Sequence, residues 1–240
     1  MFRAHGPAPW LIGAALALTS LGAATAGVFE DGLAAYSRGD YATALALWRP
    51  LADQGDAKAQ NNLGGVYEQG AGVAQDFDLA ASWFRKAADQ GLGSAQYNLA
   101  LLLEKGQGVA QDYVQAASWY RKAADKGMTG AQHKLGDLYA QGLGVPKDMA
   151  EAVRWFRLAA DKGDPEAQWY LGLACENGQG APLDYVEAYK WYSLAAAPVG
   201  LSPQAKATFL RRQGAVAAKM TPDQIAQAQR AVSDWTSRSR

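Results

Sequence analysis

Few side chains in this chain of 240 residues could carry out chemistry. The sequence has two histidines and one cysteine, and His5 lies in an apolar N-terminal stretch. A transition-metal site is usually built from several histidine or cysteine ligands, so His133 and Cys175 do not suffice. Motifs typical of metalloproteases, α/β-hydrolases, P-loop proteins and dinucleotide-binding enzymes are absent from the sequence. The sequence therefore predicts a non-enzymatic protein with no catalytic residue, metal site or cofactor.

The most regular charged feature is an aspartate that recurs every 36 residues. In a stack of helical units, successive aspartates stand about 10 Å apart, too far for a pair of catalytic carboxylates. An aspartate that precedes a helix can instead accept hydrogen bonds from the first free backbone N–H groups. We therefore interpret this series as N-caps: Asp40, Asp76, Asp112, Asp148 and Asp184.

The same 36-residue period covers the chain from Asp40 to Ala196, and we call each set of equivalent positions a lane. Apolar residues within a unit recur at the spacing of two amphipathic helices, each followed by a glycine. Cys175 falls in an apolar lane, which predicts a buried, unreactive thiol. One lane is aromatic throughout and reads Trp48, Phe84, Tyr120, Phe156 and Tyr192.

A single helix pair cannot bury its apolar face, whereas stacked pairs share a continuous core. The repeat therefore predicts an all-α fold, a curved α-solenoid. The segment AQNNLGGVYEQGAGVAQDFDLAASWFRKAADQG, residues 59–91, resembles the Sel1-like repeat (SLR), a relative of the tetratricopeptide repeat. This resemblance implies a right-handed α-solenoid of stacked helix hairpins whose first helices line the inner, concave side.

The lanes divide the chain into four parts. Residues 1–26 are expected to form a cleavable signal peptide, 27–55 an N-terminal capping helix pair, and 56–199 four Sel1-like repeats. Residues 200–240 are expected to form C-terminal capping helices with a frayed tail. A capping box, Thr221-Pro222-Asp223-Gln224, predicts the start of the last helix.

The signal peptide is predicted from Arg3, the apolar stretch from Trp10 to Leu21, and the small residues Ala24-Thr25-Ala26. Export would place the protein in the periplasm or outside the cell. An uncleaved N-terminal anchor is the alternative, although the apolar stretch is short for spanning about 30 Å of hydrocarbon. After cleavage we expect no stable membrane insertion.

One face of the first helices is not explained by a shared core, because its lanes change chemistry from repeat to repeat. A surface shaped by a partner can vary in this way, and neutral drift of a solvated face is the alternative. We expect removal of both Tyr97 and Trp169 to abolish partner binding without loss of stability. The candidate partner-binding residues are Asn61, Tyr97, His133, Trp169, Leu101, Asp137, Glu104 and Glu176.

The charge balance, 23 basic against 23 acidic side chains, offers no basic patch for nucleic acid. The predicted function is a periplasmic scaffold or adaptor that binds a partner protein or peptide in its concave groove. The alternative is a repeat protein that binds or hydrolyses cell-wall material or β-lactams. The members of the family linked to that activity carry a cysteine pair in each repeat, and this chain has one cysteine in all.

Overall fold

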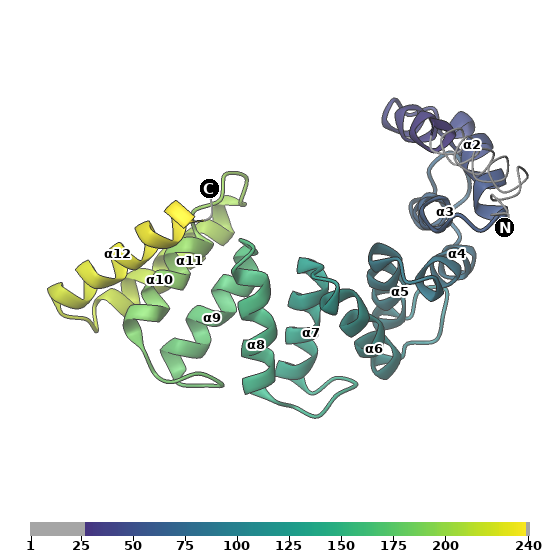
Figure 1. Ribbon diagram of the computed structural model, residues 1–240. Helices are drawn as coiled ribbons and strands as arrows, with labels where there is room; N and C mark the ends of the chain where they lie inside the picture. Colours follow the sequence, from purple (N-terminus) through teal and green to yellow (C-terminus); the bar gives the residue numbers. More distant parts are fainter. Residues whose placement is uncertain (1–26, 239–240) are drawn as a thin grey trace, which may run out of the picture. The chain divides into compact units, whose positions relative to one another are not determined.

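The computed structural model describes residues 27–238, and every regular element within that range is an α-helix (Figure 1). A first helix covers 27–37 and precedes eleven labelled helices. The predicted signal peptide and the last two residues lie outside the described range. The labelled helices are α2 (Tyr41–Asp53), α3 (Ala57–Gln69), α4 (Phe77–Asp89), α5 (Gly93–Lys105), α6 (Tyr113–Asp125), α7 (Thr129–Gln141), α8 (Met149–Ala160), α9 (Pro165–Asn177), α10 (Tyr185–Ala195), α11 (Pro203–Ala217) and α12 (Pro222–Arg238).

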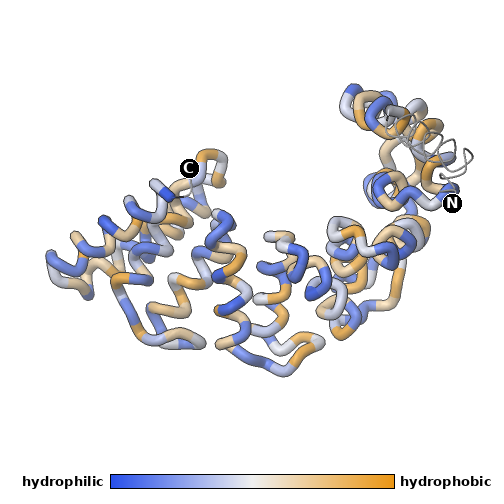
Figure 2. Tube along the Cα trace, viewed as in Figure 1, coloured by the Kyte–Doolittle hydropathy of each residue, from blue (hydrophilic) through white to orange (hydrophobic). Residues whose placement is uncertain are grey.

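These helices form two compact units. Of the described residues, 27–95 and 107–109 belong to unit 1, and 96–106 and 110–238 belong to unit 2. In unit 1, α3 packs against α2 and α4. In unit 2, each helix from α6 to α10 packs against the next, and α10 also contacts α11 and α12. Hydrophobic and hydrophilic residues alternate along these helices, as amphipathic packing requires (Figure 2).

The aspartate lane caps the second helix of each repeat, as predicted. Asp76 accepts a hydrogen bond from the backbone N–H of Leu79 at 2.9 Å, and Asp112 accepts one from Gln115 at 2.9 Å. The hydrogen bonds from Gln115 hold the pKa of the Asp112 carboxyl below its ordinary value. Asp40, Asp148 and Asp184 cap their helices in the same way.

Within each hairpin, the aromatic lane of the second helix packs on a small residue of the first. A Cβ atom added to Gly136 would lie 2.7 Å from the Phe156 ring, and one added to Gly172 would lie 2.4 Å from the Tyr192 ring. Both distances are below van der Waals contact, so glycine lets the two helices approach closely. The aromatic rings are accordingly buried, with Tyr192 fully covered and Phe156 2 % exposed.

A lane that is invariably glutamine links successive hairpins within a unit, through Gln60 in unit 1 and through Gln132 and Gln168 in unit 2. The Nε2 group of Gln132 donates to the carbonyl of Ala124 at 3.1 Å, and Gln168 donates to Ala160 at 3.1 Å. These carbonyls lie in the last turn of the preceding helix, where no intrahelical donor remains. The glutamine is therefore a structural cap for a helix C-terminus.

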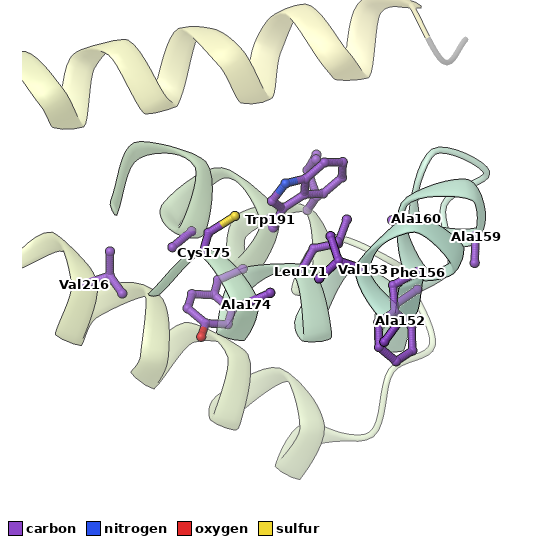
Figure 3. Packing of buried hydrophobic residues seen from close by; sticks show 14 residues of the cluster. Ala152, Val153, Phe156, Ala159, Ala160, Leu171, Ala174, Cys175, Trp191 and Val216 are labelled. Carbon is purple, nitrogen blue, oxygen red and sulfur yellow. The ribbon is translucent and has the colours of Figure 1, made fainter. Parts of the chain in front are cut away.

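A large core cluster in unit 2 is built by α8, α9, α10 and α11. In Figure 3, Leu171 and Trp191 lie between Phe156 of α8 and Val216 of α11. Cys175 belongs to this cluster and is 3 % exposed, which confirms the predicted buried thiol. Burial raises the pKa of the Cys175 thiol to about 11. At neutral pH the group is a thiol rather than the nucleophilic thiolate.

The C-terminal helices begin as the sequence predicts. The backbone N–H of Thr221 donates to the Gln224 side chain at 2.8 Å, and the N–H of Gln224 donates to the Thr221 hydroxyl at 3.3 Å. This reciprocal pair is the predicted capping box. Val232 and Trp235 of α12 then pack against the large cluster of unit 2 and cover its last face.

Candidate functional site

The candidate residues of the variable lane lie on the first helices of the repeats, and in unit 2 each packs on an aromatic ring of the same hairpin. Ring centroids of Tyr97 and Tyr120 are 5.7 Å apart. Those of His133 and Phe156 are 5.9 Å apart. The lane therefore supports the hairpins and is only partly open to solvent.

Trp169 illustrates this double role and requires a correction. Its ring lies 5.0 Å from that of Tyr192 and 5.1 Å from that of Phe209, and it joins two core clusters. Removing this side chain would leave a void beside buried residues. The expectation that Trp169 and Tyr97 can be replaced without loss of stability is therefore wrong for Trp169, because its ring is part of the packing between α9, α10 and α11.

Glu104 forms a polar network on α5 and α6. The hydroxyl of Tyr120 donates to Glu104 Oε2 at 2.5 Å, and Lys134 Nζ lies 3.1 Å from Glu104 Oε1. Burial, followed by the hydrogen bond to Glu104, raises the pKa of the Tyr120 hydroxyl far above its ordinary value. Glu104 thus holds α5 against the second helix of its own repeat and against α7 of the next.

Glu176 has the equivalent position on α9 but lies in the interior, 6 % exposed. Tyr192 donates to its Oε2 at 2.8 Å, and its Oε1 lies 3.4 Å from Arg212 Nη1 and 3.2 Å from Lys219 Nζ. Arg212 lies on α11, and Lys219 lies just after the end of that helix. Glu176 was expected to meet a partner, yet its side chain is enclosed by these groups of its own chain, which gives it a structural role.

His133 lies on α7, 8 % exposed, and is surrounded by carboxylates. Its Nε2 is 3.5 Å from Asp137 Oδ2, and its Nδ1 is 3.5 Å from Asp164 Oδ1 and 3.7 Å from Glu166 Oε2. Burial alone would lower the pKa of the imidazole, but the hydrogen bond that the ring donates to Asp164 and the nearby negative charges raise the pKa above its ordinary value. The ring bridges α7 to the N-terminus of α9.

Asp137 is one turn after His133 on the same helix, and its side chain is 19 % exposed. Burial raises the pKa of this carboxyl although His133 and Lys134 act in the opposite direction. Among the residues that the structure describes, the His133 ring is its one hydrogen-bond or ion-pair partner. Asp137 is thus a half-covered carboxylate with spare capacity to accept hydrogen bonds.

Four further side chains that meet around these residues were not predicted from the sequence. Tyr170 is 38 % exposed and stacks on the Phe156 ring with centroids 4.8 Å apart. It occupies a second lane of changing chemistry, Asn62, Asn98, Lys134 and Tyr170, which the same reasoning could have identified. Asp164 and Glu166 flank Pro165 at the start of α9, where the local sequence indicates only a helix N-terminus. The fourth such side chain is that of Lys134.

We call the surface that these side chains share the α5–α7–α9 face. It consists of Tyr97, Glu104, His133, Lys134, Asp137, Asp164, Glu166 and Tyr170, all in unit 2. Leu101 lies on α5, one turn after Tyr97, and is partly buried. Asn61 is also partly buried but belongs to unit 1, so it is described apart from this face.

No helix within 27–238 is long and apolar enough to cross a membrane. Over the same residues, no group of three or more histidine, cysteine, aspartate or glutamate side chains has an arrangement suited to a metal ion. The α5–α7–α9 face thus combines partly exposed tyrosines and carboxylates on a packed support.

Solved structures of similar proteins share this fold. A Sel1 repeat protein from Oxalobacter formigenes is 30% identical, with a TM-score of 0.67, over 78% of this chain and 84% of that one. The protein c5321, a protective antigen present in uropathogenic Escherichia coli strains and displaying an SLR fold, is 31% identical, with a TM-score of 0.56. That alignment covers 88% of this chain and 53% of c5321. No protein with a curated description matches.

The stacked hairpins define the protein as an α-solenoid. The Sel1 repeat matches it five times, at residues 15–56, 57–92, 93–128, 129–164 and 165–197, and the chain belongs to the Sel1 repeat family. The last four matches coincide within one or two residues with the four predicted repeats. The first includes the helix pair that the sequence analysis treats as an N-terminal cap. Proteins of this family are generally non-catalytic scaffolds for protein–protein interaction.

Proposed function

We propose that this protein is a non-enzymatic adaptor that binds a partner protein or peptide on the α5–α7–α9 face. The observation that carries the proposal is that tyrosines and carboxylates gather on three successive first helices. Buried aromatic rings of the second helices pack against Tyr97, His133 and Tyr170 of this face. Aromatic side chains on a rigid support are typical anchors of protein interfaces. The packed repeats thus hold the helices of this face in place, while the side chains on the face can differ from those of related proteins.

We further propose that the adaptor acts in the periplasm. Support comes from the charged start, apolar stretch and small residues of the predicted signal peptide. N-terminal sequencing of the protein from fractionated cells is expected to find Gly27 as the first residue, in the extracytoplasmic soluble fraction. Recovery of the intact N-terminus in the membrane pellet would support the anchor alternative instead.

Site-specific photo-crosslinking tests the adaptor proposal without disturbing the fold. A benzophenone amino acid replaces Tyr170 on the face, and control variants carry it at Val114 or Leu183. The controls are 66% and 60% exposed, against 38 % for Tyr170, so non-specific encounters favour the controls. We expect one defined adduct, identified by mass spectrometry, from the Tyr170 position in producing cells and none from the controls.

The crosslinking result is decisive in either direction. An adduct of equal yield at all three positions would show non-specific encounter, and absence of an adduct at Tyr170 would contradict binding at this face. Circular dichroism of each purified variant confirms that the helices are retained.

A further inference from the structure

The α5–α7–α9 face has an excess of negative charge. Four carboxylates gather there, while the basic side chains are Lys134 and the titratable His133. Lys134 is paired with Glu104, and this pair neutralises one carboxylate. The remaining acids outnumber the remaining base even when His133 is protonated. A bound segment that carries positive charge would complement this surface.

Asp137 has capacity to accept a new donor within the face, as does Glu166, whose side chain is 72% exposed. The one internal partner of Asp137 within the described chain is the His133 ring, at 3.5 Å, which is long for a hydrogen bond. Glu104 differs, because it already accepts hydrogen bonds from Tyr120 and Lys134. Asp164 differs too, because it caps α9 through the backbone N–H of Ala167 at 2.7 Å. An ammonium or guanidinium group would satisfy Asp137 with charge-assisted hydrogen bonds.

Two tyrosines add apolar surface beside these charges. Tyr170 is the more exposed of the two, and Asp137 and Glu166 are near enough to add to the effect of burial in raising its pKa. Burial also raises the pKa of Tyr97, with Glu104 and Asp164 contributing. A tyrosine ring can contact both the aliphatic stem and the charged end of a lysine or arginine side chain.

We propose that the α5–α7–α9 face binds a basic peptide segment, with a lysine or arginine side chain paired to Asp137 and neighbouring apolar side chains lying on Tyr170. This inference rests on the proposed adaptor function and specifies the chemistry of its partner. Charge complementarity selects the basic segment over an acidic or purely apolar one.

Binding is expected to depend on pH. The groups around His133 are Lys134 and Asp137 on its own helix, Asp164, Glu166 and Tyr170 from α9 and its N-cap, and Tyr97 and Glu104 from α5. Protonation of His133 adds a positive charge to the face, and protonation of Asp137 removes a negative one. Both events occur on acidification, so a cationic peptide should bind more tightly at about pH 8 than at about pH 5.5.

The test uses the purified full chain and two synthetic peptides labelled with fluorescein, one of alternating lysine and leucine and the other with glutamate in place of lysine. Fluorescence anisotropy at low salt measures binding. The test variant is Asp137→Asn. The control variant is Asp125→Asn, which makes the same change in net charge at an exposed position at the end of α6.

We expect the lysine peptide to bind, the glutamate peptide not to bind, and Asp137→Asn to weaken binding about tenfold, the effect of a lost charge-assisted contact. Asp125→Asn should bind like the parent. Equal binding of both peptides, binding of neither, or parental affinity of Asp137→Asn would each overturn the inference. If these tests fail while the Tyr170 crosslink still forms, the adaptor function stands with a different partner chemistry.

Discussion

The buried pair of Glu176 and Tyr192 gives a prediction with a natural comparison inside the chain. In two repeats a glutamate at this position accepts a hydrogen bond from the tyrosine sixteen residues later, Glu104 from Tyr120 and Glu176 from Tyr192. The repeat between them has Ala140 and Phe156 instead, with no polar group at either position. The double variant Glu176→Ala with Tyr192→Phe therefore places a combination that the fold already accommodates into another repeat.

The single changes should each be costly. Tyr192→Phe removes a 2.8 Å hydrogen bond to a charged acceptor, which is worth about 1.5–3 kcal/mol. Glu176→Ala leaves the hydroxyl of a fully buried tyrosine without an acceptor, at a cost of about 1–3 kcal/mol besides the lost volume. The double variant removes the hydroxyl and its acceptor together, so neither is left without the other. Its loss should be smaller than the sum of the single losses by about 1.5–3 kcal/mol.

Urea denaturation of the full chain, followed by helical circular dichroism, measures the three losses. A second cycle that combines Tyr192→Phe with Glu187→Ala is the control, because Glu187 pairs with Lys190 at 2.6 Å. We expect additivity there, within about 0.5 kcal/mol. Additivity in the Glu176 cycle as well would refute the reasoning, since it would show that the hydroxyl and the carboxylate do not depend on each other.

Three further predictions concern single residues. Gly136→Ala should destabilise the protein by about 1–3 kcal/mol, because its Cβ would lie 2.7 Å from an aromatic ring. Gly65→Ala has open space around it and should stabilise helix α3 by up to about 1 kcal/mol. Denaturation midpoints compare the two variants, and equal losses of stability would contradict the packing argument. His133 has a pKa above its unfolded value of 6.5, so its stabilising effect is complete below that value and is lost as pH rises through the folded pKa. The stability difference between the parent and His133→Gln should therefore be larger at about pH 5.5 than at about pH 8, and a difference independent of pH would show that the charge of the ring does not matter. Cys175, 3 % exposed and with a pKa raised to about 11, should react with a thiol reagent only when urea unfolds the chain, and rapid labelling of the native protein would contradict its burial.

The regular part of the fold could be predicted because repetition marks the residues that packing requires. The caps at Asp76 and Asp112 and the capping box at Thr221 follow from local sequence, and the structure confirms them. Such features depend on contacts within a few residues, or on contacts that every repeat makes alike. The same regularity made the family resemblance specific.

The candidate site could be predicted only in part. That His133 meets Asp137 follows from their spacing on one helix, but its contacts with Asp164 and Glu166 depend on how one hairpin packs on the next. Glu176 was assigned to the surface because its cations lie on α11 and just after it, beyond the repeats, where no periodicity indicates the register. The role of the site in binding stays a prediction.

Two kinds of polar contact, one between hairpins and one within a hairpin, also determine at which points recombination of the gene would preserve the fold. The glutamine of a first helix, such as Gln132 or Gln168, donates to a backbone carbonyl of the preceding helix, a partner that every sequence provides. The hydroxyl of a buried tyrosine instead depends on the glutamate of its own hairpin. Recombination between hairpins would keep each such pair together, whereas recombination in the loop inside a hairpin could join the alanine helix of the third repeat to a tyrosine helix and leave the hydroxyl without its acceptor. Whole repeats are therefore the units that duplication, loss or exchange can move with every tyrosine still paired.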